Sequence, residues 1–358
     1  MSPVRLDKDV LDAITLGGAF YGGGGGGPIT QGVELGQLAL QYGNPTMISI
    51  DEMPGDAILL TVSAVGAPAA QGQHAKAYHY VRAVELFIKY SGIEVHGFIS
   101  NECGGLASVN GWIQSAAFGL PVVDAPCDGR AHPTGIMGSM GLRWPEYTSL
   151  QAACGGSRSE GTYVEIFTTG SPEKTAALVR QAAVQAGGLV AVARNPVEAS
   201  YVRSHGAPGS LEKCIKVGRA MLDAKTRGPL EMAQAAAATA DGKVMFTARV
   251  SKKDLETVGG FDVGQITFDN GAQVVFWNEY ITLDMGAERL ATFPDLIATI
   301  STESGVPLSS TDIVPDSEVA VVVVPKGHLI LGAGVKDKSL FYAVEEATGQ
   351  RIIEYVFK

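Results

Sequence analysis

The stretch Glu94–Ala125, EVHGFISNECGGLASVNGWIQSAAFGLPVVDA, decides the fold class. EVHGFIS (94–100) is a short apolar run typical of a buried strand, GLASVNGWIQSAAFG (105–119) has a helical pattern that ends at a glycine, and LPVVDA (120–125) is a second strand. The order strand, helix, strand predicts a parallel sheet. The loops after Ser100 and Val123 then share the carboxyl edge of the sheet, where open α/β sheets bind ligands.

The flanking sequence extends this pattern and then changes. AILLTVSAVG (57–66) predicts a further strand, and residues 75–92 predict the helix that follows it. After an alanine-rich stretch near residue 236, short apolar or alternating runs are separated by Gly, Asn and Asp turns, with a hairpin signal at DNG (269–271). We therefore predict an α/β amino-terminal domain with a largely parallel sheet (1–168), holding the active site, and a mostly β, α+β carboxyl-terminal domain (169–358).

The composition excludes several functional classes. Of 358 residues, 46% are apolar and 18% charged, but no window reaches the roughly 18 uninterrupted apolar residues of a membrane span. The amino-terminal MSPVRLDKDVLDA lacks the apolar stretch of a secretory signal, so we expect a cytoplasmic protein. The net charge is −10 and Lys and Arg are dispersed, which argues against nucleic acid and membranes as partners. We expect a small-molecule substrate and homo-oligomeric assembly.

Six consecutive glycines, Gly22 to Gly27, are the most unusual segment. The backbone N–H groups of Gly24, Gly25 and Gly26 could bind a carboxylate or carbonyl of a small ligand. A nucleotide phosphate site is an alternative, although the run follows a predicted helix and no Gly-Lys-Ser/Thr comes after it. A close-packed structural turn is the third interpretation.

Reactive side chains follow both predicted strands. A thiol at Cys103, beside Asn101 and Glu102, would have its pKa lowered at a helix start. In DAPCDGRAHP (124–133), Cys127 and His132 lie five residues apart, and together with Cys103 they would give three zinc ligands with a fourth position open for water.

The remaining polar groups of these loops complete this hypothesis. Glu102 or Asp128 would serve as general base, and Arg130 would hold a substrate carboxylate. Asn101 and His74 are further candidates for contact with the substrate. In a metal-free alternative, Cys127 is a nucleophile that His132 activates. A purely structural loop is the other alternative.

Three segments together resemble a known family: LGGAFYGGGGGGP, NECGGLASVNGWIQSAAFGLPVVDAPCDGRAHP and FPDLIATISTESGVPLSSTDIVPDSEVAVVVVP. They are similar to the S-methyl thiohydantoin desulfurase family, formerly domain of unknown function 917, over about residues 11–325. Many members have Asp-Ala-Asp-Gly-Met-Gly-Arg-Ala-Phe-Pro where this chain has DAPCDGRAHP. Asp124, Gly129, Arg130 and Pro133 match that form, whereas Cys127 and His132 depart from it.

The resemblance implies an α/β domain followed by a β-rich domain, and hydrolytic loss of a thiol from a five-membered cyclic thioimidate. Such a reaction needs a base or metal-bound hydroxide and a proton for the leaving thiolate. A zinc ion is the expected cofactor, and no organic cofactor is expected. One alternative is a non-catalytic subunit of a hydantoinase or oxoprolinase-type assembly, in which Cys103, Cys127 and His132 do not converge and no pocket joins the domains. Another is a nucleotide-dependent enzyme that uses Gly22 to Gly27.

Overall fold

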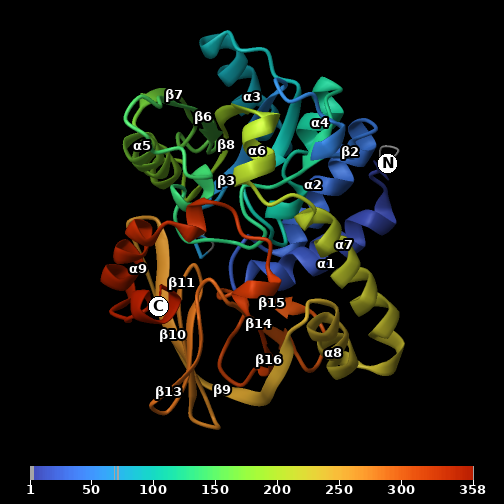
Figure 1. The fold of residues 1–358 in the computed structure, drawn as a ribbon, viewed down its shortest axis with the longest axis vertical. Coiled ribbons are helices and arrows are strands. Elements are labelled where there is room, and N and C mark those ends of the chain that lie inside the picture. The colour runs from blue at the N-terminus through green and yellow to red at the C-terminus, as the bar shows by residue number, and fades with distance from the viewer. Residues whose placement is uncertain (1–3, 68, 71, 358) are drawn as a thin grey trace.

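A computed structural model describes residues 4–67, 69–70 and 72–357. The described part of the chain contains two eight-stranded sheets. They lie one above the other in Figure 1, with α1 and α7 beside their junction. Both sheets bury apolar side chains, and the amino-terminal sheet and its helices form the larger core. The predicted fold class, α/β followed by a β-rich part, is confirmed.

The first sheet is parallel at its centre. Its strands β2 (Thr46–Ser49), β5 (Val122–Asp124), β4 (Gly97–Ser100) and β3 (Ile58–Gly66) lie in that order and all run the same way. The helix between β4 and β5 is α4 (Trp112–Phe118), so the predicted strand, helix, strand unit is present. The carboxyl ends of β4 and β5 therefore share one edge, as a parallel sheet requires.

Antiparallel strands widen this sheet on both sides. Strand β8 (Leu189–Glu198) pairs with β3, and β6 (Ser149–Gly155) and β7 (Val164–Gly170) follow outward, while β1 (Val4–Arg5) lies at the opposite edge. The sheet is thus mixed rather than wholly parallel. The domain division predicted at residue 168 falls inside β7, and the first sheet uses strands from both sides of it.

Helices cover the first sheet and connect it to the second. They are α1 (Lys8–Gly22), α2 (Ile29–Tyr42), α3 (Ala77–Ser91), α5 (Pro172–Gln185), α6 (Ala199–His205), α7 (Ser210–Ala224) and α8 (Pro229–Thr239). A Cβ atom on Gly17 of α1 would lie 1.9 Å from the Cys214 carbonyl oxygen of α7. Only glycine permits this backbone-to-backbone approach, which fixes α1 against α7.

The start of α7 is tied to the edge of the first sheet. Asp124, the last residue of β5, accepts hydrogen bonds from the backbone N–H groups of Leu211 (2.8 Å) and Glu212 (3.1 Å). A carboxylate in this position satisfies free N–H groups of the first helical turn and complements the helix dipole. Asp124, one of the residues that match the common form of the family, therefore has a structural role: it holds the loop after β5 in place.

The second sheet is antiparallel, in the order β13-β12-β11-β10-β9-β16-β14-β15. These strands are β9 (Lys243–Val258), β10 (Phe261–Phe268), β11 (Ala272–Trp277), β12 (Glu279–Met285), β13 (Glu288–Thr292), β14 (Leu296–Ser301), β15 (Pro307–Leu308) and β16 (Glu318–Val324). The hairpin predicted at DNG joins β10 and β11, where Gly271 has the positive φ (86°) that such a turn requires.

The carboxyl-terminal helices α9 (Phe341–Thr348) and α10 (Ile353–Val356) pack beside the second sheet through a cluster that contains Phe293, Phe341 and Ile352 (Figure 1). Within the described residues, no helix has the length and apolarity to cross a membrane. Cytoplasmic location and homo-oligomeric assembly stay predictions.

Candidate active site

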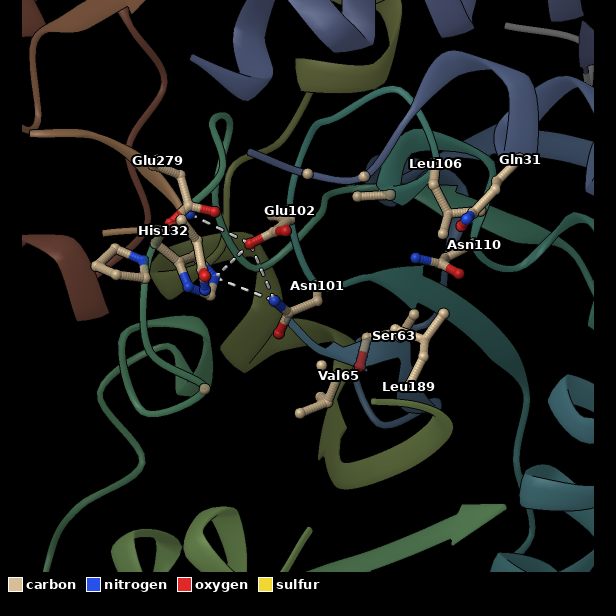
Figure 2. Close-up of a pocket in the computed structure, with 18 of the residues that line it drawn as sticks. Gln31, Ser63, Val65, Asn101, Glu102, Leu106, Asn110, His132, Leu189 and Glu279 are labelled. Carbon is tan, nitrogen blue, oxygen red and sulfur yellow. Dashed lines mark hydrogen bonds and ion pairs between the residues drawn. The ribbon is translucent and has the colours of Figure 1, made fainter. Parts of the chain in front are cut away.

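A cavity of about 90 Å³ lies where the two sheets meet. Its polar lining residues are Gln31, Ser63, Gln73, Asn101, Glu102, Asn110, His132, Arg180, Arg194, Asn278 and Glu279. Figure 2 shows Asn101, Glu102, His132 and Glu279 grouped together, with Gln31, Leu106 and Asn110 farther along the cavity. A cavity of this size holds several water molecules or a small organic group. Converging polar side chains in a concave site are typical of an active site.

Glu102 enters this cavity directly after β4. The Ser100 hydroxyl donates to the backbone carbonyls of Glu102 (2.5 Å) and Ala107 (2.9 Å), which holds the turn that presents the carboxyl group. Burial raises the pKa of Glu102 well above its usual range, and the nearby Glu279 carboxylate raises it further. The raised pKa favours the protonated form of Glu102, which can donate a proton.

A chain of hydrogen bonds fixes the proton arrangement of His132. Arg194 Nη2 donates to Asn101 Oδ1 at 2.5 Å, so the Asn101 amide nitrogen faces the ring and lies 3.1 Å from His132 Nε2. Because an amide nitrogen only donates, Nε2 accepts and the imidazole proton is on Nδ1. Burial, followed by the Arg194 charge, lowers the pKa of His132 to about 3. The ring is neutral near pH 7.

The neutral imidazole also contacts Glu102. His132 Nε2 lies 3.3 Å from Glu102 Oε2, and the His132 backbone N–H donates to the same oxygen at 3.3 Å. An acceptor nitrogen beside an ionised carboxylate would be repulsive, whereas a protonated Glu102 donates to it. Glu102 Oε2 also lies 3.4 Å from the Asn101 amide nitrogen, which donates to it. Since Nε2 has one lone pair for Asn101 and Glu102 to share, the raised pKa is the stronger reason to place a proton on Glu102.

The second carboxyl group, Glu279, comes from the second sheet and was not among the predicted site residues. It is the first residue of β12 and follows Asn278, whose φ is +57°. Burial raises the pKa of Glu279 to about 7, while Arg130 and the backbone amide of Gly26 act in the opposite direction. A sequence signal existed, because Asn278 and Glu279 interrupt the apolar run AQVVFWNEYITLDMG.

The glycine run packs against both halves of this site. A Cβ atom on Gly25 would lie 2.1 Å from Glu279 Oε1, and one on Gly26 would lie 2.5 Å from Gly104 Cα. The N–H groups of Gly23 and Gly25 donate to backbone carbonyls at the end of α1 and within the run. Of the predicted residues Gly24, Gly25 and Gly26, only Gly26 lines the cavity. The run holds the Glu279 carboxyl group instead of presenting a row of free amides.

The two predicted cysteine ligands lie apart from the cavity and from each other. Cys127 Sγ is 3.4 Å from Thr61 Oγ1, and burial raises the pKa of this thiol to about 11. Cys103 faces Cys214, and that contact together with burial raises its pKa well above the usual value. Both thiols are fully buried. The structure thus opposes the low pKa that we expected for Cys103 at a helix start.

His132 therefore lies near Glu102 and Asn101, and neither Cys103 nor Cys127 is beside it. In the described part of the chain, no group of three or more His, Cys, Asp or Glu side chains is arranged to hold a metal ion. The predicted set Cys103, Cys127 and His132 is not assembled, because each cysteine faces a different layer of the core.

Asp128, Arg130 and His74 also differ from their predicted positions. Asp128 is buried and accepts from the Gly332 N–H at 2.8 Å, with its pKa raised to about 7 by burial. Arg130 donates to the carbonyl oxygens of Pro294 (3.2 Å) and Asp295 (2.5 Å), so it ties the first half to the second. The His74 ring packs edge-on against His79. None of the three is among the residues that line the cavity.

Family models match most of the chain. The S-Me-THD-like N-terminal domain matches residues 9–160, and the S-Me-THD-like C-terminal domain matches residues 170–330. A crystal structure of a protein from Chromobacterium violaceum superposes with a TM-score of 0.69 at 21% identity, covering 96% of each chain, which shows a shared fold. No curated protein matches the chain.

Proposed function

Because this chain belongs to the S-Me-THD-like family, we propose that it hydrolyses an S-methyl thiohydantoin to the hydantoin and methanethiol. Water adds to the ring carbon that bears sulfur and forms a tetrahedral adduct. The C–S bond then breaks, the oxygen of the added water becomes the ring carbonyl, and the leaving methanethiolate takes up a proton. One water molecule is consumed for each methanethiol released.

The observation on which this proposal rests is a pair of carboxyl groups in one cavity, Glu279 buried and Glu102 with a side chain that is 15% exposed. Burial raises the pKa of both groups, and the Glu279 charge raises the pKa of Glu102 further, so Glu102 favours its protonated form while Glu279 ionises near pH 7. Two carboxyl groups with separated pKa values are the usual arrangement for general acid and general base catalysis.

The environments assign the two roles. Glu279 has a pKa of about 7 and faces the amide of Gly26, so its ionised form removes a proton from the attacking water. Glu102 holds its proton beside His132 and gives it to the leaving methanethiolate. For the next turnover the proton that Glu279 took from water has to leave it and Glu102 has to be protonated again; His132, with a pKa of about 3, positions the Glu102 carboxyl group and does not carry this proton.

Two other interpretations have weaker support. A non-catalytic subunit was expected to lack a pocket between its domains, whereas the cavity here is lined from both sheets. A phosphate-binding loop needs free backbone donors, but amides of the glycine run are used within the run and toward Glu279. The zinc ion expected from the sequence would need donors other than Cys103 and Cys127, and metal analysis of the purified protein tests that expectation separately.

Product analysis in ¹⁸O-labelled water tests the reaction. Purified protein is incubated with an S-methyl thiohydantoin, free thiol is titrated, and the ring product is examined by mass spectrometry. We expect methanethiol and hydantoin in equal amounts, with one ¹⁸O in the new carbonyl group. Ring-opened product without thiol release would replace this function by cyclic amide hydrolysis.

A further inference from the structure

Strand β7 is a long, regular edge of the first sheet (Figure 1). Of the four edge strands in the described part of the chain, β1 and β15 have two residues each. The third, β13, pairs with β12 in an irregular register, and its Arg289 donates to Gln350 and to the Arg351 carbonyl oxygen, so the carboxyl-terminal residues lie beside it. By contrast, the seven residues of β7 pair with β6 without a bulge. A long edge without such protection is where another strand can be added.

The outer side of β7 has free backbone groups. In an antiparallel sheet the N–H and C=O groups of alternate residues point to opposite sides, so half of those in β7 point away from β6. Within the described residues, no hydrogen bond joins this backbone to any segment other than β6. The strand sequence VEIFTTG has neither Pro nor Lys, the residues that commonly protect edges. Its one charge, Glu165, is neutralised by Arg82 of α3 through hydrogen bonds of 2.8 and 3.1 Å, so it does not oppose pairing.

Exposed apolar and aromatic side chains flank this edge. On one face, the Phe167 ring of β7 lies 5.6 Å from the ring of Tyr90 in α3, and Tyr90 is 56% exposed. On the other face, α5 packs against β7, and its Leu178 is 52% exposed. A groove of about 590 Å³ beside β7 extends this surface toward Tyr42 and Tyr78. A stable dimer buries about 800 Å² of each subunit, more than one strand supplies, so a partner needs these flanks as well.

The charges beside β7 favour a second copy of this chain as the partner. The groove is lined by two cations, Arg82 and Arg158, and by two carboxylates, Glu85 and Glu165, so its charges balance. The chain as a whole has a net charge of −10, so two copies repel each other on average. In a balanced region two copies meet without that repulsion, and opposite charges can face each other across a two-fold axis.

We propose that two copies of this chain associate by antiparallel pairing of their β7 strands, which joins the two first sheets into one sheet of sixteen strands, eight from each copy. Complete overlap of the strands puts the two-fold axis at Phe167, the middle residue of β7. Glu165 then faces Thr169 of the partner subunit, so no like charges are opposed, and the two Phe167 rings form an aromatic pair. Strand β7 contributes no residue to the cavity, and the inference does not depend on the proposed function.

Sedimentation velocity over a range of protein concentrations tests the association. We expect the wild type to have the mass of two chains, with dissociation on dilution that gives a Kd. A protein that stays monomeric at about 100 μM would overturn the pairing and leave this edge to a strand of another protein.

Two substitutions at Thr169, which is exposed, test the register. Thr169→Glu puts a carboxylate opposite Glu165 of the partner subunit at two symmetric places, so we expect the Kd to rise about fivefold or more. Thr169→Lys puts a cation there, and the dimer should be as tight as the wild type or tighter. Thr247→Glu is the matched control, because Thr247 is exposed on β9, which has a partner strand on each side. Equal Kd values for Thr169→Glu and Thr169→Lys would overturn the proposed interface.

Covalent capture gives an independent test of the same register. In the double variant Glu165→Cys/Thr169→Cys, each new thiol faces one of the partner subunit, within the reach of a disulfide. Oxidised glutathione should convert this variant to a covalent dimer on a non-reducing gel. The single variants should stay uncrosslinked, because equivalent positions then lie about 13 Å apart along the strands, and the four native cysteines are buried. No covalent dimer in the double variant, or as much in the single ones, would overturn the pairing.

Discussion

The imidazole Nε2 of His132 lies 3.3 Å from Oε2 of Glu102. Since Asn101 donates to the same nitrogen, the His132 proton is on Nδ1, and the contact with Glu102 is favourable only when that carboxyl group is protonated. In the reaction proposed above, this is the proton that the leaving thiolate takes up. This relationship joins the loops after β4 and β5, which the parallel order of the strands brings to one edge.

Glu102→Gln should decrease kcat/KM for thiol release by about 10²–10⁴, the usual contribution of a positioned acid. The amide has the shape of the protonated carboxyl group, so the fold should be retained, as thermal melting will show. Glu256→Gln, on the exposed part of β9, is the control. Activity within threefold of the wild type in Glu102→Gln would contradict the assignment of Glu102 as the acid.

The contribution of Glu279 to the stability of the protein should fall as the pH rises from about 4.5 to about 7, whereas His132 and His79, whose pKa values are lowered to about 3 and about 4, contribute in the opposite direction below pH 6.5. In that window the unfolded chain ionises Glu279, whose ordinary pKa is 4.5, while the folded state keeps the proton because its pKa is about 7. The unfolded state then binds fewer protons, which favours unfolding. Glu279→Gln should reduce this fall, measured by urea unfolding at pH 5 and pH 7.5. An unchanged pH dependence in the variant would show that Glu279 titrates normally.

Gly25→Ala should reduce activity by displacing a catalytic group rather than by straining the backbone. The added Cβ would lie 2.1 Å from Glu279 Oε1, which must move. Gly327→Ala is the matched control, because a Cβ there has no neighbour within 4 Å. We expect at least a tenfold loss of kcat in the first variant and none in the second. Full activity of Gly25→Ala would contradict the assignment of Glu279 as a catalytic carboxylate.

Cys127→Ser should keep thiol release within a few-fold of the wild type. The thiol is buried beside Thr61, its pKa is raised to about 11, and it does not line the cavity. We expect a loss of stability of about 1–2 kcal/mol, because the new hydroxyl lies in an apolar core. Kinetics and thermal melting separate these effects. Loss of activity in a stably folded variant would restore the nucleophile hypothesis.

The sequence predicted the fold because local patterns determine it. The apolar run before Asn101, the helix that ends at Gly119 and the DNG hairpin each follow from periodicity and turn residues within a short window. Pairing of β8 between β3 and β6 could not be predicted in this way. It depends on contacts between strands that are distant in sequence, and this is why the first sheet extends past the division predicted at residue 168.

Only part of the site could be predicted, for a related reason. Asn101, Glu102 and His132 follow strands whose carboxyl ends share an edge, so their convergence follows from strand order. Which side chain of a loop faces the cavity depends on packing. Cys127 contacts Thr61 instead, and Arg130 binds the backbone carbonyl of Asp295. Glu279 is 177 positions from Glu102 in the sequence, and the contact between the two sheets brings it to the cavity. No local sequence pattern predicts that contact.

The most direct measurement of the central claim is the rate of methanethiol release from an S-methyl thiohydantoin by the wild type and by Glu279→Gln at pH 7.5, with Gly327→Ala as the control. The account predicts thiol release by the wild type and the control, and a rate at least about a hundredfold lower in Glu279→Gln. Release at the same rate by all three proteins would contradict catalysis by the carboxyl pair Glu102 and Glu279.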